Sequence, residues 1–307
     1  MILLLGCMNV DSFVHNPVHC STVGADTCPS AWHPLDDVCV PCDEEYDWGF
    51  DHPWLDGTFE EGAEPRDIDA STVLRDTIRT EDDLADLDLY FVPAWTGSTT
   101  TVLYNHGNYA GIEHYLPRVR FLHEAGYNVL VWDYRGYGKS TQGAPTAEQF
   151  LADARQIRAI SDGYVPDPDR VVIYANSLGG IPAVEMAVDD PGCALMLEAS
   201  FTSTELIAQS NTTLSLGEQF LSEGRFDNVE KIRGYDGPVF GMVGGEDEKF
   251  PPEDFRQLIE AAPGPTELWI LDGVKHGMSN GGVPEAGLAE YFERMDAFLV
   301  EHAPECL

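Results

Sequence analysis

The stretch that decides the fold is RVVIYANSLGG, residues 170–180. Its first half is a run of apolar residues, rich in valine and isoleucine, that is typical of a buried strand. The second half places Ser177 between that strand and two glycines, where a plain turn into a helix would need no hydroxyl. The spacing of Ala175, Ser177 and Gly179 matches the strained strand-to-helix turn GxSxG, with alanine in place of the first glycine. Small residues are needed there because strand and helix approach closely while the serine side chain is pushed outward.

Outward from this turn, apolar runs alternate along the chain with segments whose apolar residues recur at helical spacing. Apolar strands that alternate with helices predict a mostly parallel sheet covered by helices on both faces. We therefore expect a doubly wound α/β fold. The expected strands lie within residues 87–94, 99–107, 127–138, 170–175, 193–200, 238–245 and 266–273, and the expected helices lie within 115–126, 146–161, 251–262 and 285–302 and directly after Ser177.

Length and charge limit the classes of protein. A chain of 307 residues, 43% of them hydrophobic, can bury the core of one large domain, and we expect one such domain and a monomer. The chain has no run of about 20 apolar residues, the length that spans a bilayer. Its formal charge of -36 repels phosphate backbones, so nucleic acid is not an expected partner. A salt-adapted surface is one interpretation of this acidity.

The N-terminal sequence ILLLGCMNV places a small residue directly before Cys7. This arrangement resembles the lipobox at which bacterial lipoproteins are cleaved and the cysteine is acylated. Only Met1 to Leu5 precede the site, whereas a secretory signal has a basic region and an apolar stretch of about 7 to 15 residues. Either the true start lies upstream or the match is due to chance. On the first alternative we expect export to the periplasm or cell surface, with a lipid anchor at Cys7.

Cysteines are concentrated near the N-terminus. Cys20, Cys28, Cys39 and Cys42 lie in one stretch rich in proline, aspartate and serine. Two disulfides there would staple a loop-rich segment, as in proteins of oxidising compartments. A zinc knuckle at the motif CVPC is the alternative, although only one CxxC pair is present and such sites use two closely spaced pairs. We expect no metal.

The two remaining cysteines, Cys193 and Cys306, either pair with each other or remain buried thiols.

An acidic segment, DEEYDWGFDHPWLDGTFEEGAEPRD at 43–67, predicts a linker or surface wrap. Its aromatic residues, among them Trp48, Phe50 and Trp54, indicate that parts of it dock on the main domain. We expect three regions, which are a signal remnant at 1–7, a cysteine-rich segment with linker at 8–66, and the main domain at 67–307.

Six motifs then follow one another along the main domain. They are YNHGN at 104–108, VWDYRGYGKS at 131–140, ANSLGG at 175–180, LEASFTS at 197–203, GGEDEKFPP at 244–252 and VKHG at 274–277. Together they resemble the α/β-hydrolase superfamily, and within it small single-domain serine hydrolases similar to serine aminopeptidases and to the catalytic domain of prolyl oligopeptidases. The resemblance spans about residues 70–302 and leaves the N-terminal segment outside. It implies an α/β-hydrolase fold with a short cap and a serine nucleophile.

A serine hydroxyl attacks efficiently only when a base takes its proton, and an acid must hold that base in the right tautomer. His276 follows the last expected strand, and Asp247 follows the strand before it. Both therefore lie at carboxyl ends of strands, where such sheets gather reactive groups. The order Ser177, Asp247, His276 is also the order that this fold uses.

Three other carboxylates are alternatives for the acid. Glu246 and Glu248 flank Asp247, and Glu198 follows an earlier strand. We expect Glu198 to be a polar residue that packs under the loop rather than the acid of the triad.

The oxyanion formed when Ser177 attacks needs donors as well. Two backbone N–H groups suffice, one from the residue after the nucleophile and one from the loop after the strand that ends LYNHG. This rule predicts Leu178 and Asn108, with Tyr109 as the alternative to Asn108.

These residues predict a serine hydrolase that cleaves a small-molecule ester or thioester through an acyl-enzyme on Ser177, without a cofactor. Residues 201–234 leave room for a short helical cap only. Amide or peptide cleavage by the same triad is an alternative. A further alternative is a surface-anchored binding protein that keeps the fold without turnover. The GxGKS within DYRGYGKS lacks P-loop spacing, so we expect no nucleotide site.

Overall fold

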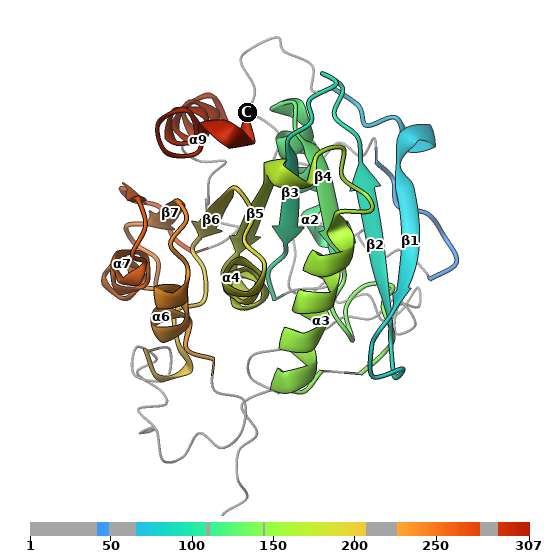
Figure 1. The fold of residues 1–307 in the computed structure, drawn as a ribbon, viewed down its shortest axis with the longest axis horizontal. Helices are drawn as coiled ribbons and strands as arrows, with labels where there is room; N and C mark the ends of the chain where they lie inside the picture. Colours follow the sequence, from blue (N-terminus) through green and yellow to red (C-terminus); the bar gives the residue numbers. More distant parts are fainter. Residues whose placement is uncertain (1–41, 49–65, 109–110, 144, 207–225, 277–287) are drawn as a thin grey trace, which may run out of the picture.

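An eight-stranded sheet forms the centre of the molecule in the computed structural model, which describes residues 42–48, 66–108, 111–143, 145–206, 226–276 and 288–307. Its strand order is β1-β2-β4-β3-β5-β6-β7-β8 (Figure 1). β2 pairs antiparallel with β1 and β4, and all pairs from β4 to β8 are parallel. The strands span Leu74–Arg79 (β1), Asp86–Val92 (β2), Thr101–Asn105 (β3), Asn128–Trp132 (β4), Val171–Asn176 (β5), Ala194–Glu198 (β6), Val239–Gly244 (β7) and Thr266–Leu271 (β8).

Helices cover both faces of this sheet. On one face α3, α4 and α7 share an apolar cluster with the strands, and on the other face α2 and α9 do so. The expected doubly wound α/β architecture is therefore confirmed. The helices span Ile112–Glu124 (α2), Ala147–Ser161 (α3), Gly180–Asp189 (α4), Asn228–Lys231 (α6), Pro252–Ala261 (α7) and Leu288–His302 (α9).

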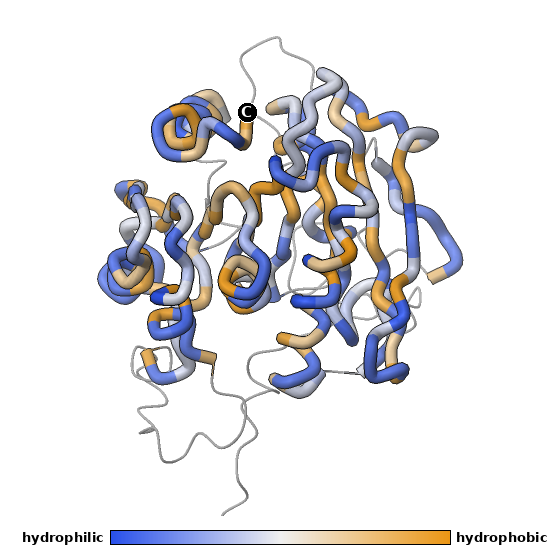
Figure 2. The backbone as a smooth tube through the Cα atoms, viewed as in Figure 1, coloured by the Kyte–Doolittle hydropathy of each residue, from blue (hydrophilic) through white to orange (hydrophobic). Residues whose placement is uncertain are grey.

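The central strands are buried along their whole length, as their continuous apolar runs predict. Every residue of β3, β4, β5, β6 and β7 is buried. Apolar positions concentrate along these strands in Figure 2. Successive residues of a strand point to opposite faces, so that Leu103 joins the cluster under α3 and α4 while Tyr104 joins the cluster under α2 and α9.

β1 is a strand that the apolar periodicity does not predict. Its sequence, LRDTIR, has few apolar residues, and most of its side chains are exposed. It is an edge strand, and its pairing with β2 rather than burial holds it in place. Charged residues are common on such edges because they discourage pairing with another chain.

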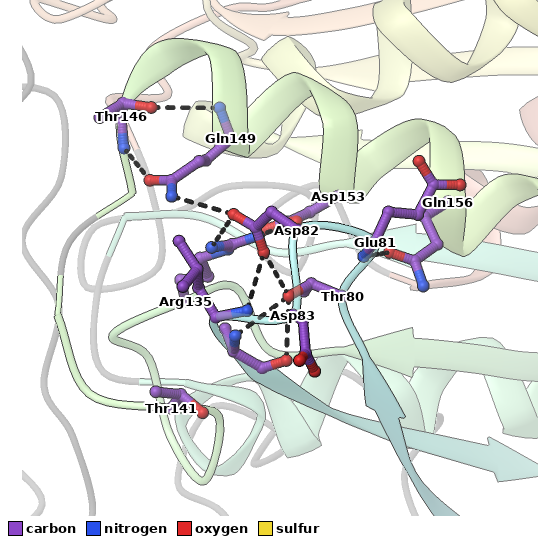
Figure 3. Close-up of polar contacts among 12 residues, drawn as sticks. Thr80, Glu81, Asp82, Asp83, Arg135, Thr141, Thr146, Gln149, Asp153 and Gln156 are labelled. Atoms are coloured by element: carbon purple, nitrogen blue, oxygen red, sulfur yellow. Dashed lines mark hydrogen bonds and ion pairs between the residues drawn. The ribbon is translucent and has the colours of Figure 1, made fainter.

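The turn between β1 and β2 is fastened to the rest of the molecule by Arg135, which lies in the loop after β4 (Figure 3). The guanidinium donates two hydrogen bonds to Asp153 of α3, at 2.6 and 2.7 Å, and two to Asp82 in the turn, at 2.8 and 2.9 Å. Burial raises the pKa of Asp153, whereas the bonds from Arg135 lower the pKa of Asp82. One side chain thus joins three segments that are distant in the sequence.

Both cysteines of the main domain are paired with each other. Cys193, just before β6, and Cys306, at the C-terminal end, form a disulfide with Cα atoms 5.6 Å apart. Of the two alternatives for these residues, the paired form is the correct one.

The N-terminal segment is described only at residues 42–48. Trp48 is buried, as we expected of a docked aromatic residue, whereas Phe50 and Trp54 lie outside the described residues. Cys42 is disulfide-bonded, which favours a stapled segment over the zinc knuckle. The positions of Cys7, Cys20, Cys28 and Cys39, and most of the expected cap, at residues 207–225, also lie outside the described residues. Among the helices that the structure describes, none has the length and apolar character needed to cross a membrane.

Replacement of Arg135 tests the fastening of the β1–β2 turn. We expect Arg135→Met to lower the free energy of unfolding by about 3 kcal/mol, because Asp153 would stay buried without its partner. The double variant Arg135→Met/Asp153→Leu should recover most of that loss. Equilibrium unfolding in urea measures both effects, and a single variant as stable as the native chain would contradict the prediction.

Candidate active site

Ser177 lies at the sharp turn between β5 and α4. Its φ is 54°, in the left-handed region that a serine rarely adopts. The residues Ser177–Gly179 form one turn of 3-10 helix, and α4 begins at Gly180. Pro182 is therefore the third residue of α4, within the first turn, where a proline is tolerated.

Close packing around this turn explains its small residues. A Cβ atom on Gly179 would lie 2.0 Å from the carbonyl oxygen of Asn105, at the end of β3. A Cβ atom on Gly180 would lie 2.6 Å from the Cβ of Ser200. The backbone N–H of Phe201 also donates to the carbonyl of Ser177, at 2.8 Å. Neighbouring segments thus hold the serine in a conformation that costs energy by itself.

The structure brings together the three residues predicted for the triad. Nε2 of His276 lies 3.3 Å from Oγ of Ser177, and Nδ1 of His276 lies 2.8 Å from Oδ2 of Asp247. A carboxylate accepts a hydrogen bond from the Nδ1–H group, which leaves Nε2 unprotonated and able to take the proton of the serine hydroxyl. The arrangement can therefore activate Ser177 as a nucleophile.

The position of Asp247 is fixed by backbone donors. Its Oδ1 accepts the N–H groups of Lys249 and Phe250, each at 2.8 Å, while Oδ2 faces the imidazole. The ring of Phe250 packs edge-on against His276, with centroids 5.0 Å apart. Both contacts leave Asp247 and His276 little freedom to turn away from each other.

The alternative acids are placed differently. Glu246 and Glu248 are exposed on either side of the buried Asp247. Glu198 is buried at the end of β6, where it forms an ion pair with Arg118 of α2, with Nη2 2.7 Å from Oε1. The expectation that Glu198 packs beneath the loop agrees with this position.

A buried polar network surrounds Glu198 beneath the turn at Ser177. The hydroxyl of Tyr174 donates to Glu198, and the neighbouring Tyr104 donates to Oδ1 of Asn176 at 2.8 Å. The rings of Tyr104 and Tyr174 contact each other edge to face, with centroids 5.5 Å apart. These contacts extend from the core to Asn176, the residue directly before Ser177.

The predicted oxyanion donors lie on two separate segments. Leu178 follows Ser177 in the 3-10 turn and is buried, and Asn108 lies three residues beyond β3. The side-chain oxygen of Asn108 accepts the hydroxyl of Tyr137 at 2.5 Å. Tyr109, the alternative donor, lies outside the described residues. The roles of these residues stay predictions.

Asp133 is a site-forming residue that sequence reasoning missed. Its Oδ1 accepts the N–H of Ile112, the first residue of α2, at 2.8 Å, and lies 3.3 Å from Nε2 of His106. It therefore accepts a hydrogen bond from one end of the loop that carries Asn108 and contacts the other end. Asp133 lies within the motif VWDYRGYGKS, in which we predicted no site residue.

Metal binding has no visible site in the part of the chain that the structure describes. No three or more histidine, cysteine, aspartate or glutamate side chains gather there in a way that could hold an ion.

Known proteins resemble this chain in sequence. The family model described as serine aminopeptidase, S33, matches residues 97–222. An uncharacterised protein of Mycobacterium tuberculosis is 33% identical over 213 residues, which cover 67% of this chain and 75% of that protein. Human α/β-hydrolase domain-containing protein 17B is 28% identical over 212 residues, which cover 68% of this chain and 69% of that protein.

Solved structures agree in fold. A Pyrococcus furiosus esterase, Pf2001, superposes with a TM-score of 0.59 at 22% identity, covering 75% of this chain and 91% of that one. A monoacylglycerol lipase of Paleococcus ferrophilus superposes with a TM-score of 0.52 at 18% identity, covering 69% of this chain and 99% of that one.

The chain belongs to the α/β-hydrolase superfamily, and its broad activity class is that of a hydrolase.

Replacement of Asp247 tests the arrangement of the site. We expect Asp247→Asn to lower the kcat for an activated ester by about 10³- to 10⁴-fold, because an amide no longer holds His276 in the productive tautomer. Glu246→Gln, one residue away and exposed, is the matched control and should leave kcat unchanged. Steady-state kinetics on both variants measure the difference, and equal rates would exclude Asp247 as the acid.

Proposed function

We propose that this protein is a serine hydrolase that cleaves a carboxylic ester or thioester through an acyl-enzyme on Ser177. The observation that supports it best is the continuous line of contacts from Ser177 through His276 to Asp247. A binding protein without turnover would have no need of this line, because an aligned acid and base serve proton transfer.

In this mechanism the hydroxyl of Ser177 attacks the substrate carbonyl while Nε2 of His276 takes its proton. Backbone N–H groups of Leu178 and Asn108, or of Tyr109, stabilise the negative charge on the carbonyl oxygen. The imidazolium then returns the proton to the leaving alcohol or thiol, and the acyl group stays on Ser177. Water attacks this acyl-enzyme with the same base, which releases the carboxylic acid and restores the serine.

An ester or thioester is favoured over an amide by the solved structures of similar fold, of which several bear the names esterase or lipase. Amide or peptide cleavage stays the second candidate, because the matching family model carries the name serine aminopeptidase and the same triad performs both reactions.

Labelling with a fluorophosphonate probe tests the nucleophile. We expect the native chain to be labelled and Ser177→Ala to lose the label, while Ser71→Ala, at an exposed serine, keeps it.

The same preparation, assayed with a p-nitrophenyl ester and a p-nitroanilide of one acyl group, should cleave the ester at the higher kcat/KM. Label that does not depend on Ser177 would defeat the hydrolase mechanism, and faster cleavage of the anilide would favour the amide alternative.

We also propose that the protein is exported and carries a lipid on Cys7. The Cys193–Cys306 disulfide and the disulfide-bonded Cys42 support export, because such bonds persist in oxidising compartments. Mass spectrometry of the mature N-terminus from the native host should find an acylated Cys7. An unmodified chain that keeps Met1 would contradict the anchor.

A further inference from the structure

Among the residues of the N-terminal segment that the structure describes, Tyr46 extends its side chain to Asp133, beside the candidate active site. We propose that Tyr46 is a positioning residue, which holds the carboxylate of Asp133 and thereby the loop that supplies the second oxyanion donor. This inference rests on the proposed function. It gives the N-terminal segment, which lies outside the family resemblance, a part in the hydrolase site.

Two aromatic side chains of residues 42–48 pack on the main domain. Tyr46 and Trp48 are both buried, and each ring lies 5.3 Å from the ring of Tyr90 on β2. Nζ of Lys139 lies over the ring of Tyr46, 4.1 Å from its centre. The segment therefore docks through a cluster of aromatic rings and one cation, a type of contact that fixes ring orientation.

Polar contacts extend this docking along the segment. Nζ of Lys139 also donates to the carbonyl of Glu44, and Glu45 forms an ion pair with Arg75 of β1 at 3.3 Å. Cys42, four residues before Tyr46, is disulfide-bonded. A covalent link so close to the docked residues limits the conformations open to the segment.

The hydroxyl of Tyr46 lies 3.4 Å from Oδ2 of Asp133. Burial, followed by the negative charge of Asp133, raises the pKa of Tyr46 well above its ordinary value. The hydroxyl therefore keeps its proton and serves as a donor to the carboxylate.

Asp133 is closely surrounded within its site. Its side chain is fully buried between two glycines. A Cβ atom on Gly138 would lie 2.0 Å from Oδ2, and a Cβ atom on Gly111 would lie 2.7 Å from Oδ1. Within this enclosure three donors orient the carboxylate, and these are the hydroxyl of Tyr46 and the N–H of Lys139 on Oδ2 and the N–H of Ile112 on Oδ1.

A small displacement of the Asp133 carboxylate would shift the loop that carries the predicted oxyanion donor. Oδ1 of Asp133 contacts His106 at one end of the loop and binds Ile112 at the other end. Asn108, the predicted donor, lies between them. Donors to an oxyanion act only when they are aimed at the place where charge develops, so misplacement lowers the rate without weakening substrate binding.

The variant Tyr46→Phe tests the proposal because it keeps the aromatic packing and removes the hydroxyl. Tyr127→Phe is the matched control, since Tyr127 is also buried and donates to a carboxylate, Asp296, at 2.7 Å. The two hydroxyl groups lie at opposite ends of β4. Tyr127 directly precedes the strand, whereas Tyr46 binds Asp133, which directly follows it.

We expect Tyr46→Phe to lower the kcat for an activated ester by about 3- to 30-fold and to change KM by less than about twofold. Tyr127→Phe should leave both constants unchanged. Exchange of the Ile112 amide hydrogen, followed by NMR, should be faster in Tyr46→Phe than in the native chain. The Phe250 amide, bound to Asp247, is the internal control and should not change.

An unchanged kcat together with unchanged exchange at Ile112 in Tyr46→Phe would overturn the proposal. An equal loss of kcat in Tyr127→Phe would overturn it too, because the effect would then be general destabilisation. If the native chain shows neither turnover nor label on Ser177, the proposed hydrolase function fails on its own. The exchange of Ile112 then decides whether Tyr46 holds Asp133, independently of activity.

Discussion

The strained backbone at Ser177 is the constraint on which the site depends. A serine in the left-handed region persists only where the surroundings over-determine it. Here the 3-10 turn lies against the end of β3 at Gly179, and the start of α4 lies against Ser200 at Gly180. The sheet order explains this closeness, because β3 and β6 are the direct neighbours of β5. The packing of the fold therefore keeps the hydroxyl pointed outward. His276 contacts the hydroxyl in that position, and Asp247 contacts His276.

Buried charges around this turn are held by partners from distant segments. Glu198 binds Arg118 from α2, and Asp133 binds the first N–H group of that same helix. A buried pair of this kind contributes little net stability, but loss of one partner is costly because the other charge stays buried. Such pairs suit a site that must keep one geometry, since any rearrangement would expose an unpaired charge. α2 is thereby fixed relative to both the turn at Ser177 and the loop after β3.

The sequence predicts the elements whose signal is local. Continuous apolar runs predicted the central strands, and strand-end position together with chain order predicted that Ser177, Asp247 and His276 would meet. β1 was not predicted, because an edge strand needs no apolar run. The contacts of Asp133 and Glu198 were not predicted for another reason. Tyr46 is 87 residues away from Asp133, and Arg118 is 80 residues away from Glu198. No periodicity or motif spacing records a partner at such a distance, because only the folded sheet brings the two together.

The disulfide between Cys193 and Cys306 encloses a ring of chain with a sequence separation of 113. Asp247 and His276 lie within this ring, and Ser177 lies outside it. A protease that cut the backbone once inside the ring would therefore release no fragment. Asp247 and His276 would stay covalently attached to the part of the molecule that carries Ser177, so a nicked molecule could still reassemble its candidate site as a single species.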